Sequence, residues 1–93
     1  MFDLTVLPQV VVHKKEVHGT PAATVDFPNG YSASIVRHPY SYGGKEGKYE
    51  LAVMIDNLIT YDTPITNDVL GYLSEQDVLD TCELIGELPS IKE

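Results

Sequence analysis

Apolar and polar residues alternate around a turn sequence near residue 28, a pattern typical of two strands that bury one face. The alternating apolar positions are Val25, Phe27, Tyr31, Ala33 and Ile35. The segment Pro28–Gly30 suits a three-residue hairpin loop, because proline presets φ, asparagine tolerates the second position and glycine takes a left-handed conformation. Counting outward from this loop pairs Phe27 with Tyr31 and Val25 with Ala33, so all the apolar side chains share one face.

A second alternating stretch predicts another hairpin. Its apolar positions are Tyr49, Leu51, Val53 and Ile55, followed by a turn near residues 56–57 and a strand within Leu58–Asp62. A two-residue turn would place Ile55 opposite Leu58, whereas a three-residue turn would place it opposite Ile59. We favour the three-residue turn, because it puts Ile59 and Tyr61 on the core face.

The N-terminal segment also has strand character, over Leu4–Leu7 and again over Gln9–Val17. Pro8 separates the two stretches, and a proline within a sheet is confined to a break or an edge position because it lacks a backbone donor. The segment is therefore expected to form an edge strand.

Ser74 is expected to begin a C-terminal amphipathic helix that Pro89 stops. The Ser74 hydroxyl can cap the first turn, and Asp77 lies at the third helical position of a capping box. Leu73 and Val78 are spaced to form a hydrophobic staple. An apolar stripe at helical spacing follows, made of Val78, Leu79, Cys82, Ile85 and Leu88.

Three acids, Asp80, Glu83 and Glu87, lie on the opposite side of this helix. Their spacing of three and four residues crowds the carboxylates together, and two of them fall near the helix C-terminus, where negative charge opposes the helix dipole. Each such acid costs about a few tenths of a kcal/mol, and selection for stability alone favours lysine there. We therefore predict that the three acids bind a partner. A merely solubilising surface is the alternative.

Together these elements predict a single α+β domain over residues 1–93. Its fold is expected to be a twisted antiparallel sheet of three to five strands, built from the two hairpins and the N-terminal edge strand, with one C-terminal helix packed on it. Thr66 is expected to cap a short turn over residues 67–72 that leads into the helix. A chain of 93 residues can bury only one modest core.

The net charge of −8 is unevenly distributed. Residues 1–48 carry five Lys or Arg and four Asp or Glu, a balance of +1, whereas residues 49–93 carry one Lys and ten Asp or Glu, a balance of −9. An acidic surface disfavours direct binding to nucleic acid or anionic membranes and favours a basic protein partner.

The chain contains no motif that identifies a reaction or a metal site. Three histidines, His13, His18 and His38, lack the paired spacing of a zinc site. The segment Gly43–Lys48 has three residues between its outer glycines, not the four of a phosphate-binding loop, and it leads into a strand. We expect no catalytic residues, no metal and no cofactor.

The cellular compartment is expected to be the cytoplasm. Val10–Val12 is the longest purely apolar run, far below the roughly 20 residues that span a bilayer. Cys82 is the only cysteine, which suits a reducing compartment, and its place in the apolar stripe predicts a buried thiol.

The stretch between the two predicted hairpins, residues 38–48, is expected to be a flexible loop because of its glycines. It carries Tyr40 and Tyr42, and tyrosine is a common interface anchor because it buries a large area for little lost rotamer freedom. We predict that both tyrosines bind a partner. In the alternative interpretation they pack back over the edge of the sheet.

Two stretches, SYGGKEGKYELAV at residues 41–53 and YDTPITNDVLGYL at residues 61–73, resemble those of small acidic proteins encoded by bacteriophages and prophages. This group includes inhibitors of host defence, with anti-CRISPR proteins prominent among them. The resemblance covers roughly residues 30–88 and implies no catalytic residues.

The resemblance and the charge together predict a non-enzymatic phage or prophage inhibitor that acts in the cytoplasm of the host bacterial cell. Its expected partner is a basic surface of a host nucleic-acid-handling complex, with a CRISPR effector complex as the first hypothesis and no direct contact with nucleic acid. The alternative is a phage structural or assembly protein that self-associates through a strand edge.

Overall fold

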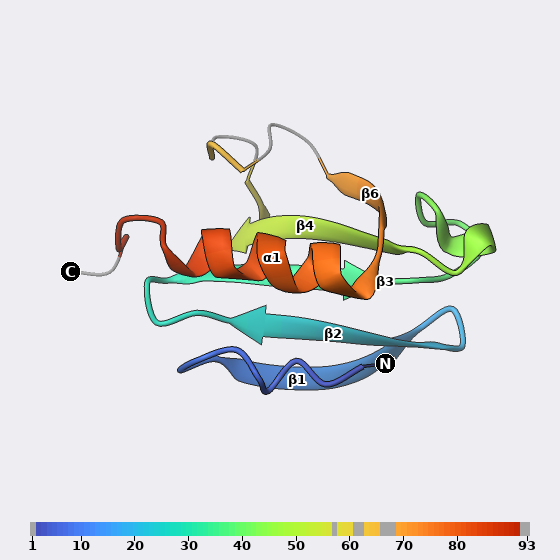
Figure 1. The fold of residues 1–93 in the computed structure, drawn as a ribbon, viewed down its shortest axis with the longest axis horizontal. Helices are drawn as coiled ribbons and strands as arrows, with labels where there is room; N and C mark the ends of the chain where they lie inside the picture. Colours follow the sequence, from blue (N-terminus) through green and yellow to red (C-terminus); the bar gives the residue numbers. More distant parts are fainter. Residues whose placement is uncertain (1, 57, 61–62, 66–68, 92–93) are drawn as a thin grey trace.

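The computed structural model describes residues 2–56, 58–60, 63–65 and 69–91. It has an α+β fold, a twisted antiparallel sheet with one C-terminal helix (Figure 1). The elements are β1 (Val11–Val17), β2 (Thr20–Asp26), β3 (Tyr31–Val36), the 3₁₀ turn η1 (Gly44–Glu46), β4 (Tyr49–Ile55), β5 (Leu58–Ile59), β6 (Leu70–Leu73) and α1 (Glu75–Gly86). The predicted fold class is confirmed.

The strand order is β1-β2-β3-β4-β5, and β6 pairs with the same edge of β4 as β5 does. The described residues thus form six strands, one more than the upper limit expected. The additional strand is β6, where we expected a short turn over residues 67–72. Leu70 pairs with Leu51 and Leu73 with Tyr49, so β6 satisfies backbone groups of β4 that β5 is too short to reach. The expected Thr66 cap lies outside the described residues.

The hairpin of β2 and β3 has the predicted register. Val25 pairs with Ala33, and the Phe27 backbone N–H donates to the Tyr31 carbonyl at 2.9 Å across the three-residue loop. Gly30 has a φ of 98°, the left-handed conformation expected there. Local turn chemistry and strand alternation therefore agree at this hairpin.

The edge strand is confirmed over residues 11–17, but Leu4–Leu7 forms turns instead of a strand. The Asp3 carboxylate accepts the Thr5 backbone N–H at 2.9 Å, a local bond that favours a turn. A hairpin that we had not predicted joins β1 to β2, with positive φ at both His18 (51°) and Gly19 (76°).

The preferred register of β5 was wrong. Ile55 pairs with Leu58 across a two-residue turn, in which Asp56 has a φ of 52°. Aspartate tolerates this left-handed conformation better than most residues, which explains why the shorter turn forms. Ile59 is consequently 44% exposed and is not in the core. Tyr61 lies outside the described residues.

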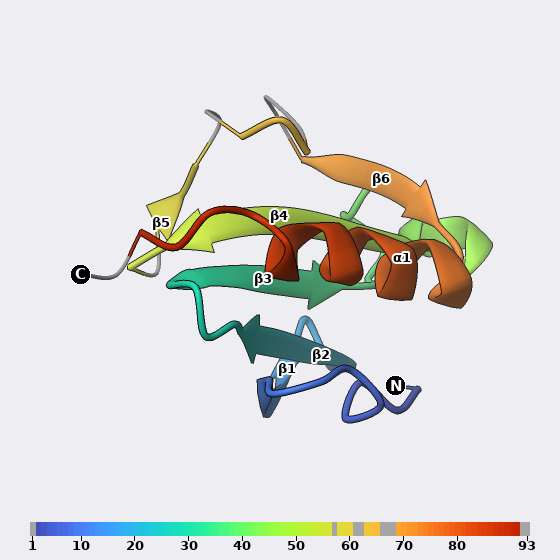
Figure 2. The ribbon, with the colours of Figure 1, turned by 60° about the vertical axis from the view of Figure 1, so that its left-hand side comes forward.

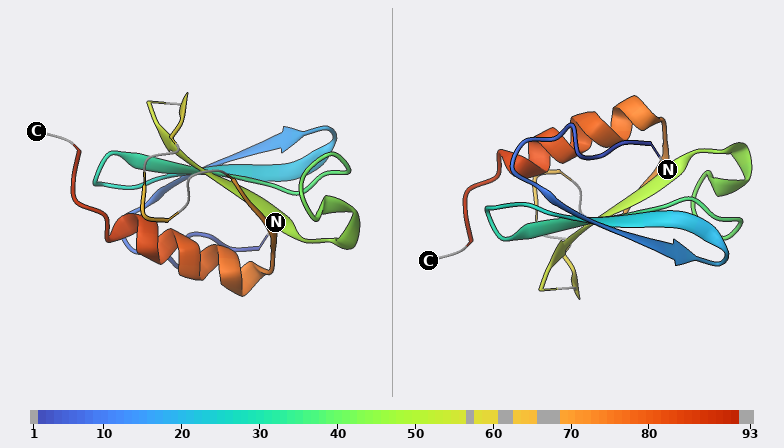
Figure 3. Two further views of the ribbon diagram at one scale, coloured as in Figure 1. Left: turned by 90° about the horizontal axis from the view of Figure 1, so that it is seen from above. Right: turned by 90° about the horizontal axis from the view of Figure 1, so that it is seen from below.

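The helix α1 lies across the face of the sheet formed by β3 and β4, and the N-terminal segment covers the same face (Figures 2 and 3). The predicted capping box is present: the Asp77 N–H donates to the Ser74 hydroxyl and the Ser74 N–H donates to the Asp77 carboxylate, both at 3.0 Å. The helix ends at Gly86, three residues before Pro89.

The hydrophobic core lies between this helix and the sheet. Its fully buried side chains include Val25, Ile35, Leu51, Val53, Val78, Cys82 and Ile85, and Leu4 and Leu7 of the N-terminal segment join the same cluster. The predicted apolar stripe therefore forms the inner side of α1, with Leu79 and Leu88 partly buried at its margins.

Candidate functional site

The outer side of α1 carries three acids, with the exposed Leu84 among them, 52% exposed. Asp80, Glu83 and Glu87, named here the acidic helix face, are all exposed. No Lys or Arg among the described residues forms an ion pair with any of the three, and Asp80 accepts one hydrogen bond, from the Gln76 side chain at 2.8 Å. These carboxylates are therefore free to meet an external cation.

The predicted tyrosine loop lies at the end of the sheet where α1 begins (Figure 1). Tyr40 is 80% exposed and Tyr42 is 61% exposed, so neither ring packs back into the fold. The Tyr40 ring meets the His18 ring edge-on, with centroids 5.1 Å apart, and His18 and His38 meet in the same way at 4.6 Å. Three side chains from two connections thus form an exposed aromatic cluster.

Close packing shapes the backbone of this loop. A Cβ on Gly44 would lie 1.8 Å from the His38 carbonyl oxygen, and one on Gly43 would lie 2.8 Å from the Tyr72 Cα. Glycine is therefore required for close approach of backbone segments, a role that the expectation of a flexible loop did not include.

A third exposed tyrosine, Tyr72 on β6, lies beside the loop. It is 56% exposed, and its backbone N–H donates to the Tyr42 carbonyl at 3.1 Å. Its φ of 57° is rare for a bulky residue and costs about 1–3 kcal/mol of strain. Sequence analysis missed Tyr72 because nothing local to β6 signals that its neighbour is the loop after β3.

The structure does not bring the tyrosine loop and the acidic helix face into one site. The loop lies near the first turn of α1, whereas Glu87 caps the opposite end of the helix (Figure 1). The connection that holds the loop carries Arg37, Lys45 and Lys48 but also Glu46, and the Tyr42 backbone N–H donates to the Glu50 carboxylate at 3.1 Å. The predicted partner-binding residues therefore belong to two separate surfaces, of which only the helix face is uniformly negative in its charged residues.

A groove opens beside the C-terminal half of α1. It has a volume of about 300 Å³ and lies between the N-terminal segment, the β2–β3 loop and the helix. Its walls are formed by Leu7, Pro8, Gln9, Val10, Phe27, Pro28, Cys82, Glu83, Gly86 and Glu87. We name it the acid-rimmed groove, because two of the three residues of the acidic helix face line it.

Cys82 lies at the inner wall of the groove with none of its surface exposed. Burial raises the pKa of its thiol to about 12, since removal from water disfavours the thiolate. The predicted buried thiol is confirmed, and at neutral pH it is protonated and a poor nucleophile.

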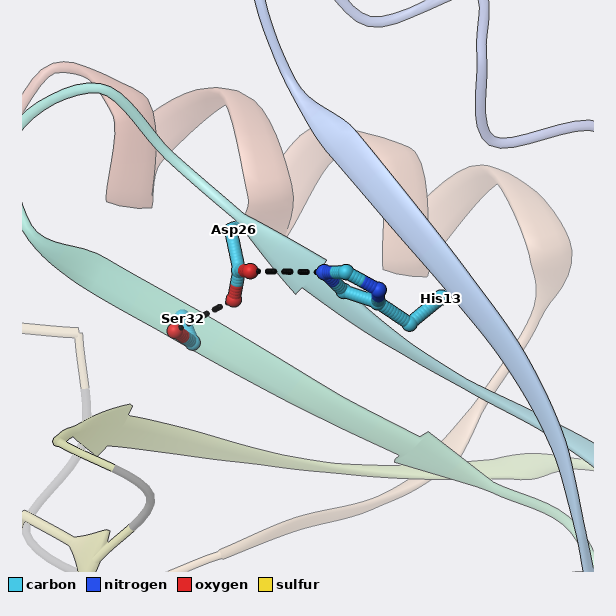
Figure 4. A network of polar contacts seen from close by, with 3 residues as sticks. All are labelled: His13, Asp26 and Ser32. Carbon is cyan, nitrogen blue, oxygen red and sulfur yellow. Dashed lines mark hydrogen bonds and ion pairs between the residues drawn. The ribbon is translucent and has the colours of Figure 1, made fainter.

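On the other face of the sheet, Asp26 joins His13 and Ser32 across three strands (Figure 4). One Asp26 oxygen lies 2.8 Å from His13 Nε2, and the other accepts the Ser32 hydroxyl at 2.8 Å. In a serine hydrolase the histidine lies between the serine and the acid, whereas here the acid lies between the other two. This arrangement does not present Ser32 to a histidine base.

Among the residues that the structure describes, no group of three or more His, Cys, Asp or Glu side chains could hold a metal ion. No helix in the described ranges is long and apolar enough to cross a membrane. No protein-family model, curated protein or solved structure matches the chain. The resemblance to phage-encoded proteins, and the partner, compartment and absence of enzymatic activity drawn from it, remain predictions.

Proposed function

We propose that this chain is a non-enzymatic inhibitor, encoded by a phage or prophage, that covers a basic surface of a host nucleic-acid-handling complex. A CRISPR effector complex is the first candidate partner, and the host cytoplasm is the proposed compartment. The observation that carries the proposal is the acidic helix face, a set of exposed carboxylates on a helix that form no ion pair with any Lys or Arg in the described part of the chain.

Negative charge extends along the whole of α1. Between Glu75 and Glu87 the chain has five acids and no Lys or Arg. Seven residues separate Asp80 from Glu87, a rise of about 10 Å along the helix axis. Such an array attracts a basic patch of similar length, speeds association and makes binding sensitive to salt.

The fold itself gives no reason for acids near the helix C-terminus. Glu83 lies in the last turn and Glu87 is the C-cap residue, and that turn contains no basic residue. Negative charge there opposes the helix dipole and is unfavourable for stability. A role in binding accounts for residues that the stability of α1 does not require.

Self-association through a strand edge is the second candidate. The β1 edge carries Lys14 and Lys15, and lysines on an edge strand oppose pairing with another chain. The β4–β5 hairpin favours the candidate more, because it exposes 73% of Leu58 and 44% of Ile59. Light scattering over a range of protein concentrations separates the two: a monomer supports the inhibitor, and a concentration-dependent oligomer supports assembly.

The test of the inhibitor proposal is a charge reversal on the acidic helix face. The partner is first captured from bacterial lysate and identified by mass spectrometry, and its affinity is then measured at low and high salt. The triple variant Asp80→Lys/Glu83→Lys/Glu87→Lys is expected to fold with undiminished stability and to bind at least tenfold more weakly, about 1.4 kcal/mol. Equal affinity at both salt concentrations would refute the proposal.

A control variant distinguishes the effect of the acidic helix face on binding from the effect of net charge. Glu16→Lys reverses one exposed acid on β1. Each reversal adds two units of charge, so the control adds two and the triple variant six. If net charge alone governed binding, the control would show about one-third of the loss in binding free energy. We expect it to bind like the wild type.

A further inference from the structure

The acid-rimmed groove is suited to one kind of side chain. We propose that it receives an apolar side chain of a partner protein, such as leucine, from a segment in which the neighbouring residues are lysine or arginine. The inference rests on the proposed function, since it makes the groove the point where the basic partner is anchored on the acidic helix face.

The inner part of the groove is apolar. Leu7, Phe27 and Cys82 line it, and each is at most 6% exposed in the free protein. The volume of about 300 Å³ is at the lower limit of the range typical of ligand pockets. It therefore has room for a large apolar side chain together with part of the adjoining segment.

The rim of the groove is acidic on the helix side. Glu83 and Glu87 are four residues apart and lie one above the other on α1. No Lys or Arg of the described ranges lines the groove. A cation beside an apolar anchor would meet both carboxylates at the edge of a poorly solvated surface, where attraction is stronger than in open water. Charge complementarity thus specifies a basic, not an acidic, segment.

The groove is held in shape before any partner arrives. Asn29 in the β2–β3 loop donates from Nδ2 to the Ile85 carbonyl at 2.8 Å and to the Leu88 carbonyl at 3.1 Å. These bonds tie the loop that carries Phe27 to the end of the helix. A preformed site avoids the entropy cost of ordering its walls on binding.

Gly86 keeps the groove open and provides a way to close it. A Cβ built there would lie 3.5 Å from Phe27 Cδ1, an ordinary van der Waals distance, so a side chain can be added without a backbone clash. Gly86→Leu would fill space between α1 and Phe27. The substitution also replaces glycine at the end of the helix by a better helix former.

The binding test uses the full chain and defined peptides. The probe is acetyl-Ser-Lys-Arg-Leu-Lys-Arg-Ser-amide, titrated to about 10 mM while backbone amide shifts are recorded by NMR. We expect a Kd of about 1 mM or tighter, with the largest shifts at Leu7, Phe27 and Gly86. A peptide with serine in place of leucine, and one with glutamate in place of each basic residue, should each bind at least tenfold more weakly.

Variants test each part of the groove. Gly86→Leu and Glu83→Gln/Glu87→Gln should each weaken peptide binding at least fivefold while their spectra remain those of a folded protein. The control Glu16→Gln/Glu46→Gln changes the net charge by the same two units as the glutamate pair and should bind like the wild type. Equal weakening by the control would refute the inference.

Three further results would also overturn it. These are the absence of shifts at the groove at the highest peptide concentration, equal binding of the serine peptide, and concentration-dependent shifts at the groove without peptide, which would identify a second copy of the chain as the occupant.

The inference and the proposed function can fail separately. If the lysine triple variant loses its partner but the peptide avoids the groove, the acidic helix face binds without this anchor. If the peptide occupies the groove but the triple variant keeps its partner, the groove binds basic apolar segments and the proposed function is wrong.

Discussion

The helix side and the tyrosine end of this molecule are built in opposite ways. The helix side is regular: α1 is capped at Ser74, buries an apolar stripe and exposes acids together with Gln76 and Leu84. The tyrosine end is irregular, since it joins a 3₁₀ turn, tightly packed glycines and a strained tyrosine, and it contains the cations Arg37, Lys45 and Lys48. The comparison indicates that the dense negative charge that attracts a basic partner lies on the helix side.

The largest loss of stability is expected at Asn29, which links the β2–β3 loop to the end of α1. Asn29 is buried, and besides donating to the Ile85 and Leu88 carbonyls it accepts the Tyr31 N–H at 3.1 Å. Asn29→Ala leaves the Ile85 and Leu88 carbonyls without this donor and should lower the free energy of unfolding by about 2–3 kcal/mol. Urea denaturation measures the loss.

Pro28→Ala is the matched control, because Pro28 lies in the same loop as Asn29 but is exposed. It should cost less than about 1 kcal/mol. If Asn29→Ala lowers the free energy of unfolding by no more than Pro28→Ala does, the end of the helix does not depend on the Asn29 hydrogen bonds.

The tyrosine end is expected to affect binding without affecting stability. If the loop takes part in recognition, Tyr40→Ala/Tyr42→Ala should weaken partner binding by about tenfold, or 1.4 kcal/mol. Because both rings are mostly exposed, the free energy of unfolding should change by less than about 0.5 kcal/mol. Calorimetric titration and urea denaturation measure the two quantities.

Unchanged binding by this double variant, together with weak binding by the lysine triple variant, would assign recognition to the helix side alone. A large loss of stability would instead show that the exposed rings contribute to the packing of the loop.

A smaller effect is expected at the start of the helix. Ser74→Ala removes the acceptor for the Asp77 backbone N–H and should lower stability at pH 7 by about 1 kcal/mol. Hydrogen bonds from the backbone and side chain of Ser74 hold the pKa of Asp77 below its usual value. Because the folded-state pKa is depressed, this carboxylate stabilises the fold above its unfolded-state pKa, and the stabilisation is lost as the pH falls through the folded-state pKa.

Urea denaturation at pH 7 and at pH 3 measures the free energy of unfolding of the wild type and of Ser74→Ala. The difference between the two proteins should therefore be smaller at pH 3. A difference that grows on acidification would contradict the role of the ionised Asp77 in the cap.

The smallest effect is expected at Tyr72. Glycine in a strand usually destabilises by roughly 0.5–1 kcal/mol, but it also relieves the strain of a positive φ. Loss of the contacts of the partly buried ring adds to the glycine penalty, and together they nearly offset the relief of about 1–3 kcal/mol of strain, so Tyr72→Gly should change stability by less than about 0.5 kcal/mol. Tyr31→Gly, in a strand without positive φ, is the control and should be clearly destabilised. Equal losses in the two variants would mean that Tyr72 carries no strain.

Exposure in the candidate site was partly predictable. Helical spacing placed Asp80, Glu83 and Glu87 opposite the apolar stripe, and all three are exposed. For Tyr40 and Tyr42 the sequence left two interpretations open, since a ring in a glycine-rich loop can face the sheet or the solvent. The contacts of Tyr40 with His18 and of Tyr42 with Tyr72 come from other elements, and they fix the loop with both rings outward.

Local interactions explain what the sequence determined by itself. The loop at Pro28–Gly30 and the capping box at Ser74 involve residues at most four apart, so their geometry follows from the φ preferences and hydrogen bonds of neighbours, and both were predicted correctly. The tertiary structure alone decided the sixth strand and the role of Asn29, which hydrogen-bonds to Ile85, 56 residues away. The acid-rimmed groove likewise combines three segments distant in the chain. These features depend on which backbone groups and surfaces remain unsatisfied once the sheet and helix have packed, and that is a property of the whole fold and not of any local pattern.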